Sequence, residues 1–332
     1  MKGTSHVASP VKIKVVGLGG AGCNAITRMA QEHIRGVDFI AMNTDVQQLE
    51  VTEAPVRIHL GRRLTGALGA GGDRDVGKRC AEESREEIKQ AIGSADMVFL
   101  AAGMGGGTGT GATPVVAEVA KESGALTIAI VTRPFTFEGN RRVRVAEEGI
   151  RQLASSVDTL IVVPNDRLLK LTGQKTGVDS AFKFADEILC HAVQAIAELV
   201  AVPGLINVDF ASVRTVMKDS GPAWMSIGRG AGQNRATTAA KESLASPLLD
   251  QSITGAKRVL FNVVGGSDLT LFEVSSAARI IQQAVDPQAN TIFGVIVDPN
   301  MGDEVRLTLI AAGFGSKDVL ASTTRVERSP GD

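Results

Sequence analysis

The chain has 332 residues and a nearly balanced charge, with 35 Lys and Arg residues against 36 Asp and Glu residues. Without a basic excess, the composition argues against nucleic-acid binding as the main task. Three cysteines are widely spaced and no Cys/His cluster occurs, so neither a disulfide framework nor a zinc site is expected. No uncharged apolar run approaches the roughly 20 residues of a membrane span, and residues 1–10 lack a signal core. We therefore expect a cytoplasmic protein without direct membrane insertion.

The first half of the chain alternates apolar strands with helical patterns. Strands are predicted at 11–17, 37–43, 97–102, 126–131 and 159–164, and helices at 25–32, 82–92, 113–122 and 143–153. Strands rich in Val, Ile and Leu that alternate with helices are typical of a parallel, doubly wound sheet. The sequence thus predicts an α/β, Rossmann-like domain.

A long helical pattern with apolar residues at 3.6-type spacing covers 178–200 and is long enough to bridge two domains. Beyond residue 221 the spacing predicts a smaller α+β domain, with strands at 225–230, 258–264, 291–297 and 304–312 and helices at 235–243 and 272–285. The predicted organisation is a disordered N-terminus (1–10), a nucleotide-binding domain (11–177), a central helix (178–202), a loop and following helix (203–220), a C-terminal α+β domain (221–317) and a polar tail (318–332).

Glycine-rich loops follow two of the predicted strands. Residues 17–24 read GLGGAGCN, which satisfies the dinucleotide-binding fingerprint but could also reflect plain strand–turn–helix packing. Residues 103–111 read GMGGGTGTG and lead directly into a helix. Such a loop offers a nest of backbone N–H donors, with two threonine hydroxyls, to a polyphosphate. No P-loop motif with its lysine occurs, so phosphate charge must be neutralised in another way.

The segment GGGTGTG at 105–111 is the signature of the tubulin/FtsZ family, and the chain resembles the FtsZ branch of that family over residues 11–317. The resemblance implies a GTPase that binds GTP or GDP and polymerises head-to-tail with itself. It implies Mg²⁺ held mainly by the phosphates, with no fixed protein-only metal site. It also implies a role in cell division at the mid-cell ring, with division-machinery proteins as partners. The tail that binds membrane adaptors in such chains is not present, so adaptor binding is not predicted.

Two further segments extend the predicted nucleotide site. Residues 66–73 (GALGAGGD) resemble the family loop that senses the γ-phosphate, although such a loop could be a surface connector. Glu138 and Arg142 have i, i+4 spacing, and the spacing alone favours an ordinary surface pair. The resemblance implies instead that they contact ribose and phosphate.

The base is expected at the start of the long helix. Asn165 follows the strand 159–164, at the edge where α/β proteins bind ligands. The Phe182 ring can stack on a base, or be ordinary core, and the Asp186 carboxylate can accept from both N1–H and the N2 amine of guanine. Adenine lacks that donor pair, which allows discrimination of roughly 10⁴ or more. The residues predicted to bind GTP are Gly19, Gly20, Ala21, Gly22, Cys23, Asn24, Ala70, Gly71, Gly72, Gly103, Gly105, Gly106, Gly107, Thr108, Gly109, Thr110, Glu138, Arg142, Asn165, Phe182 and Asp186.

Residues 205–217 resemble the family loop that projects into the next subunit's nucleotide site. Asn207 and Asp209 are therefore the predicted catalytic residues, acting on the adjacent subunit's GTP. The family pattern has a second acid where this chain has Ser212, so either hydrolysis is slowed or Ser212 is a harmless variant. Asp209 could also cap a helix that begins nearby.

Two alternative functions are also compatible with the sequence. One is a nicotinamide-dependent dehydrogenase that uses the first glycine loop and Asp45, although this leaves residues 103–111 unexplained. The other is a GTP-binding filament scaffold with little hydrolysis, suggested by Ser212.

Overall fold

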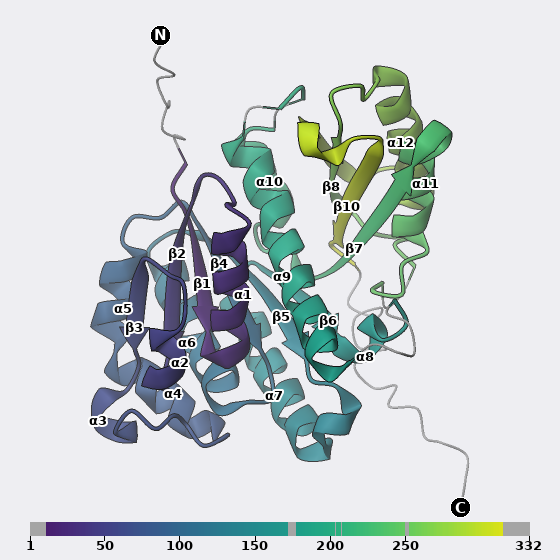
Figure 1. Ribbon diagram of the computed structural model, residues 1–332. Helices are drawn as coiled ribbons and strands as arrows, with labels where there is room; N and C mark the ends of the chain where they lie inside the picture. Colours follow the sequence, from purple (N-terminus) through teal and green to yellow (C-terminus); the bar gives the residue numbers. More distant parts are fainter. Residues whose placement is uncertain (1–10, 172–176, 203, 207, 250–251, 315–332) are drawn as a thin grey trace, which may run out of the picture.

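One continuous sheet organises the molecule (Figure 1). The computed structural model describes residues 11–171, 177–202, 204–206, 208–249 and 252–314. Across these residues the ten strands have the order β3-β2-β1-β4-β5-β6-β7-β10-β8-β9. The strands are β1 (Ile13–Leu18), β2 (Val37–Asn43), β3 (Val56–His59), β4 (Met97–Gly103), β5 (Leu126–Arg133), β6 (Thr159–Pro164), β7 (Gly221–Ala231), β8 (Arg258–Gly265), β9 (Asn290–Val297) and β10 (Glu304–Ala312).

The first six strands are all parallel, which confirms the predicted doubly wound half. The chain leaves β1 toward β2 on one side and later adds β4 on the other, so the sheet has its topological switch point between β1 and β4. In open α/β sheets, ligands bind outside the carboxyl ends of strands at such a point. Its helices are α1 (Gly19–Gln31), α2 (Val46–Glu50), α3 (Arg62–Thr65), α4 (Arg74–Glu83), α5 (Arg85–Ile92), α6 (Gly107–Glu122), α7 (Asn140–Ser156) and α8 (Asn165–Leu168).

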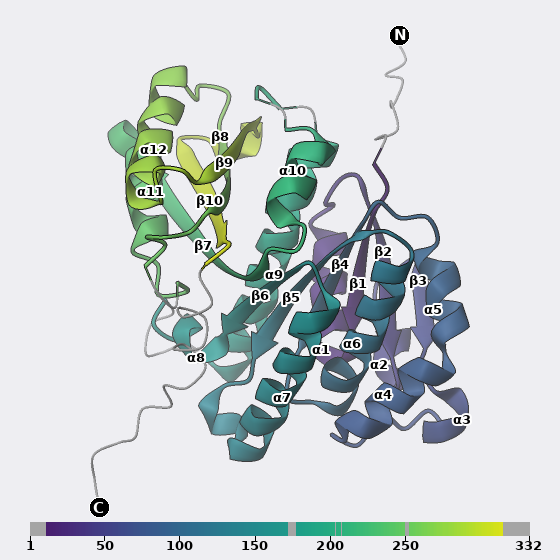
Figure 2. The same ribbon diagram turned by 180° about the vertical axis from the view of Figure 1, so that it is seen from behind.

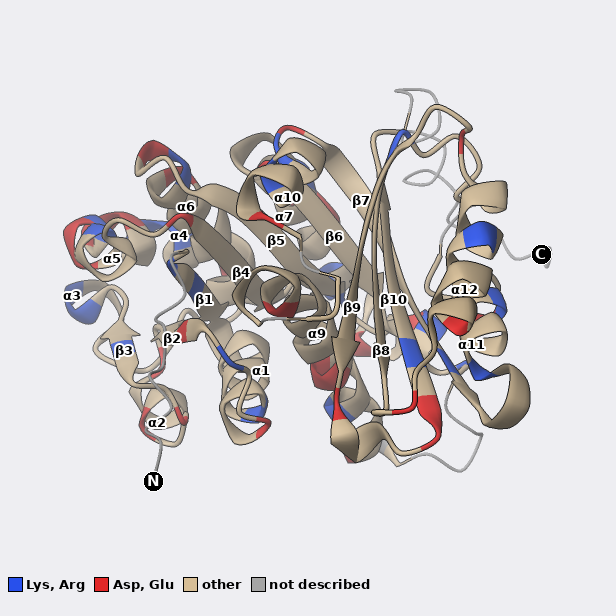
Figure 3. Ribbon diagram, turned by 90° about the horizontal axis from the view of Figure 1, so that it is seen from above, with Lys and Arg blue, Asp and Glu red and all other residues tan. Residues whose placement is uncertain are grey.

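Two helix layers bury the two faces of this half-sheet. One apolar cluster joins α1 and the central helix α9 (Val178–Ala201) to the sheet, and a second joins α4, α5, α6 and α7 to the opposite face. Figure 3 shows both layers from above. Strands buried on both faces explain the near-continuous Val, Ile and Leu runs in the sequence.

The remaining strands form the smaller mixed half that the sequence predicts. Strand β10 is antiparallel to β7 and β8, and β8 is parallel to β9. Helices α11 (Arg235–Leu244) and α12 (Leu271–Ala284) cover this half (Figure 2). Within the sheet, three residue pairs between β6 and β7 join the two halves. Helix α10 (Phe210–Met217) lies between α9 and β7 in the chain.

Several predicted boundaries differ from the structure. Helices α1 and α6 begin six residues earlier than predicted, inside the glycine loops, because packing overrides the low helix propensity of glycine. The predicted helix 82–92 is two helices that meet at Ser84, whose hydroxyl accepts from the Gly61 N–H at 3.1 Å. The short elements α2, β3 and α3 were not predicted. The N-terminus and the polar tail assigned to 1–10 and 318–332 lie outside the described residues.

Central helix α9 stabilises both halves, because its buried side chains share one apolar cluster with strands of each. Replacing the fully buried Leu189 by alanine should lower the free energy of unfolding by about 2–5 kcal/mol, measured by urea denaturation. Lys183→Ala is the matched control on the same helix, since the Lys183 side chain is 60% exposed. Equal, small losses for both variants would contradict this role of α9.

Candidate functional site

Two helix N-termini meet at the switch point of the sheet. Helix α1 follows β1 and helix α6 follows β4, and these strands are hydrogen-bonded neighbours. A Cβ added to Gly19, whose φ is +68°, would lie 2.9 Å from the backbone N of Gly109. Neither helix has a side-chain cap or an acidic residue in its first turn. Their first N–H groups and positive dipole ends are therefore available to an anion.

The glycines at this junction have two different environments. A Cβ on Gly107 would come within 2.8 Å of the Ala70 Cβ and 2.9 Å of the Asp73 carbonyl oxygen, so α6 can approach α4 only without a side chain. In contrast, a Cβ on Gly20 or Gly106 would meet no heavy atom within 4 Å. The space beside Gly20 and Gly106 is therefore open for a ligand that touches the backbone.

The two threonines of the second loop already have partners. The Thr108 hydroxyl lies 2.7 Å from that of Thr44, and the Thr110 hydroxyl accepts from the Gly105 N–H at 2.8 Å. Gly105 itself has a φ of +101°. Thr110 thus shapes the loop from within, and the backbone of the loop is what faces the ligand space.

An open cavity of about 430 Å³ lies over this junction. Fourteen of the predicted residues line it: Gly19, Gly20, Ala21, Asn24, Gly103, Gly106, Gly107, Thr108, Gly109, Glu138, Arg142, Asn165, Phe182 and Asp186. The other seven are not among the residues that line it: Gly22, Cys23, Ala70, Gly71, Gly72, Gly105 and Thr110. Cys23, for example, lies on the buried face of α1 and is part of the apolar core. The lining also contains four residues that sequence reasoning missed, namely Met104, Thr132, Pro134 and Ala185.

Three polar side chains line the cavity: Asn165, Glu138 and Arg142. Asn165 is 4% exposed, and its Oδ1 atom is buried without a hydrogen-bond partner, an arrangement that favours a ligand donor. Arg142 donates to Glu138 Oε2 at 2.5 Å, and the other oxygen of Glu138 accepts from the Phe135 N–H at 2.8 Å. The Arg142 side chain is 58% exposed and lines the cavity, so its guanidinium is accessible to an anionic ligand.

Helix α9 contributes an aromatic ring, that of Phe182, and the carboxyl group of Asp186 to the lining of the cavity. The Phe182 ring packs edge-on against Phe135 and Phe137, with centroids 5.3 Å and 6.4 Å away, and remains 40% exposed. Burial raises the pKa of the Asp186 carboxyl to about 7, and the Arg28 charge only partly offsets this. A carboxylate with few local donors is suited to accept hydrogen bonds from a ligand.

Helix α10, which lies within the predicted catalytic segment, is at the end of the molecule opposite the N-termini of α1 and α6 (Figure 1). Asp209 caps the N-terminus of α10, and its carboxylate accepts from the Ser212 N–H at 2.6 Å. The hydroxyl and the backbone N–H of Ser212 lower the pKa of the Asp209 carboxyl. The cap predicted for Asp209 is confirmed, and Asn207 lies outside the described residues. Asp209 is therefore exposed, ionised and far from the cavity of its own subunit.

Comparisons with known proteins decide the family. The family model for the "Tubulin/FtsZ family, GTPase domain" matches residues 12–173, and that for the "FtsZ family, C-terminal domain" matches residues 221–315. An FtsZ of M. jannaschii, solved as an empty dimer, is 47% identical over 91% of this chain and 88% of its own, with a TM-score of 0.89. The chain belongs to the tubulin/FtsZ family of GTPases.

Membership of the tubulin/FtsZ family makes the chain a guanine-nucleotide-binding GTPase and removes the dehydrogenase alternative. It also does not favour a scaffold with little hydrolysis. CetZ2 from Haloferax volcanii, solved as a GTPγS-bound protofilament, shares the fold at 19% identity, over 95% of this chain and 97% of its own, with a TM-score of 0.79. No helix among the described residues is both long and apolar enough to cross a membrane.

The raised pKa of Asp186 predicts a pH-dependent stability of the ligand-free protein. Between the ordinary pKa of 3.8 and about 7, the folded state keeps a proton that the unfolded state has released, so stability falls as pH rises through this window. Asp186→Asn removes this loss, so it should raise the melting temperature at pH 8 and give a progressively smaller gain toward pH 4.

Asp179→Asn is the matched control, because Asp179 lies in the first turn of the same helix but is exposed and pairs with Lys183. It should give no gain at pH 8. A gain from Asp186→Asn that is the same at pH 4 and pH 8 would contradict the assignment.

Proposed function

We propose that this GTPase binds GTP in the cavity between α1 and α6 and polymerises head to tail, with hydrolysis completed by the adjacent subunit. The observation that carries the proposal is the pair of uncapped helix N-termini, held together by glycines beside open space. Backbone N–H groups of both helices bind the β- and γ-phosphates, as they do for anions at helix N-termini generally.

The rest of the cavity matches the rest of a guanine nucleotide. Glu138 and Asn165 face the ribose, and Arg142 faces the phosphates. Phe182 contacts the base, and Asp186 accepts from its N1–H and N2 amine. Both guanine donors would be lost on an adenine, which would leave the carboxylate desolvated and unpaired.

Mg²⁺ fits this site as an ion held by the nucleotide. The described residues contain no group of three or more His, Cys, Asp or Glu side chains arranged to hold a metal. Hard cations such as Mg²⁺ often keep several waters and bind substrate phosphates directly, where they neutralise charge. The residues around the cavity then serve to position the nucleotide.

Hydrolysis is a displacement of GDP from the γ-phosphorus by water, which yields GDP and inorganic phosphate. The lowered pKa keeps Asp209 ionised, and its exposure at the end opposite the cavity makes it accessible to a second subunit. There, with Asn207, it orients the attacking water in line with the leaving oxygen. Hydrolysis therefore requires assembly, and a head-to-tail contact that does not close generates a filament.

Relatives with solved assemblies support self-association as the mode of action. One is the M. jannaschii FtsZ described as a dimer, and the other is the CetZ2 protofilament. We extend this to a cytoplasmic cell-division filament at mid-cell that recruits division-machinery proteins, on the strength of the family resemblance.

The test of this function is GTP-dependent pelleting with parallel phosphate release. The purified chain should sediment with GTP and Mg²⁺ but much less with GDP, and phosphate release should begin only above a threshold protein concentration. Phosphate release that is linear in protein concentration from zero would contradict a site shared between subunits. Pelleting without any phosphate release would revive the scaffold alternative.

Ser212 gives a second, sharper prediction. Because the Ser212 side chain lies beside Asp209, Ser212→Asp adds a second carboxylate where the family pattern has one. Turnover per assembled subunit should rise by about tenfold, the effect expected when one water-positioning group is restored. Ser212→Asn controls for size without charge, and no rise with Ser212→Asp would show that Ser212 is a neutral variant.

A further inference from the structure

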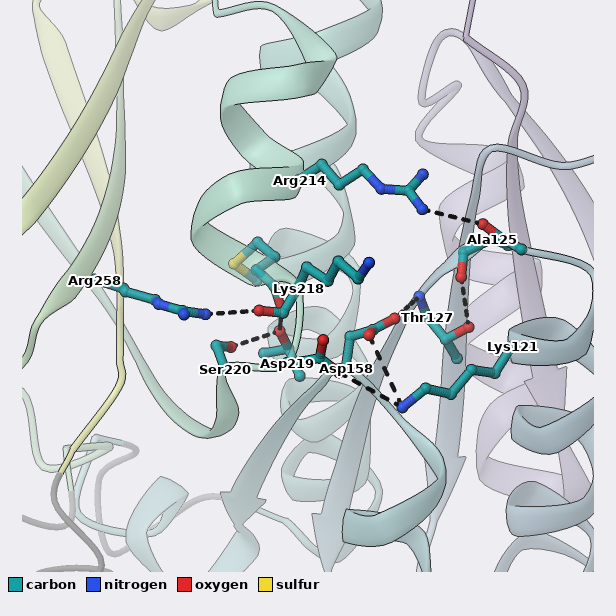
Figure 4. Close-up of polar contacts among 12 residues, drawn as sticks. Lys121, Ala125, Thr127, Asp158, Arg214, Lys218, Asp219, Ser220 and Arg258 are labelled. Carbon is teal, nitrogen blue, oxygen red and sulfur yellow. Dashed lines mark hydrogen bonds and ion pairs between the residues drawn. The ribbon is translucent and has the colours of Figure 1, made fainter.

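The C-terminal end of α10 is clamped from both halves of the molecule (Figure 4). Asp209 caps the N-terminus of the same helix. The C-terminal end leads into β7, where the two halves of the sheet join. The residues that make its polar contacts do not line the nucleotide cavity.

The nucleotide-binding half contributes Lys121, from the last turn of α6. Its ammonium lies 3.9 Å from Asp158 Oδ1 and 3.8 Å from Asp219 Oδ1. Asp158 is 4% exposed and its other oxygen accepts from the Thr127 N–H at 2.9 Å, so it is a fixed anchor on the sheet. Asp219 belongs to the turn after α10 and has a φ of +49°, a left-handed conformation uncommon for residues other than glycine.

The smaller half contributes Arg258, the first residue of β8. Its guanidinium donates to the Lys218 carbonyl at 2.6 Å and to the Val216 carbonyl at 3.5 Å. These are carbonyls of the last turn of α10 and its C-cap, which lack partners within the helix and attract a cation. From the other side, the Thr159 hydroxyl on β6 donates to the Met217 carbonyl at 2.5 Å.

A clamp at this end controls where Asp209 points. Helix α10 has eight residues and is about 12 Å long, so a tilt of about 5° at its C-terminal end moves its N-terminus by about 1 Å. A displacement of that size at a water-positioning group can cost up to about 10²-fold in rate. Helix α6, which carries Lys121, starts at the phosphate-binding loop, so the clamp also joins α10 to the element that holds the subunit's own nucleotide.

We propose that Lys121 and Arg258 are positioning residues for GTP hydrolysis, which fix the direction of α10 so that Asp209 reaches the neighbouring subunit's γ-phosphate. The inference rests on the proposed role of Asp209. The ion pairs of Lys121 are long and its side chain is 42% exposed, so they contribute little to stability. Their effect is expected in the rate of hydrolysis.

The experiment compares Lys121→Met and Lys121→Arg with the wild type. Turnover per assembled subunit at saturating GTP, GDP affinity, the threshold concentration for pelleting and the melting temperature are measured for each. Lys121→Met should lower turnover by about threefold to fivefold, which is the largest bias that exposed ion pairs of this kind can impose, with the other three quantities unchanged. Lys121→Arg should restore most of the turnover, because a displaced catalytic group affects the transition state alone.

Glu122→Gln is the matched control, because Glu122 is the next residue of α6 but pairs with Arg85 at 2.7 Å, away from α10. It should leave turnover unchanged. Arg258→Met provides a second, independent arm and should lower turnover in the same way as Lys121→Met.

Wild-type turnover in Lys121→Met would overturn the proposal, as would a loss that is matched by equal losses in assembly or melting temperature. The same holds if Glu122→Gln lowers turnover as much as Lys121→Met. If the wild type itself neither assembles nor releases phosphate, the proposed function fails and the positioning role falls with it.

Discussion

The close approach of two helix N-termini is the constraint on which this structure depends. Helices α1 and α6 leave neighbouring strands at the switch point of the sheet and meet through Gly19 and Gly109. Any side chain at Gly19 would press on the α6 backbone, so the contact exists only because the sequence places glycine there. The result is a concentration of unpaired backbone donors and helix dipoles with no cationic side chain in the loops, which suits a ligand of several negative charges.

The second organising feature is a sheet that continues from one half of the molecule into the other. The three residue pairs between β6 and β7 and the packing of α9 hold the two halves together, with α10 at their junction. The N-termini of α1 and α6, which line the cavity, lie at one end of this arrangement, and α10, which Asp209 caps, lies at the other (Figure 1). A subunit built in this way carries both parts of the proposed hydrolytic site but cannot bring them together by itself, so the proposed function requires assembly before hydrolysis.

The sequence predicted the strands and the long helices well, because buried runs such as β2 and β6 carry an unambiguous apolar signal. It missed where α1 and α6 begin, since glycine predicts a loop and only the packing against α4 and β4 makes it helical. Most residues predicted for the site line the cavity. Thr110 does not, and its hydroxyl accepts a hydrogen bond from the Gly105 N–H. Thr132 and Ala185 could not be foreseen, because they reach the cavity only through the register of β5 and α9.

The most direct measurement is calorimetric titration of GDP into the wild type and Gly106→Ala. At Gly106, φ is −92° and an added methyl group meets no protein atom within 4 Å, so the substitution fills only the proposed phosphate cradle. GDP affinity should fall by about tenfold or more, the usual cost of overpacking a well-fitted contact, while the melting temperature should be unchanged or raised. Unchanged GDP affinity in Gly106→Ala, or displacement of GDP by a nicotinamide dinucleotide in the wild type, would contradict the proposed GTP site.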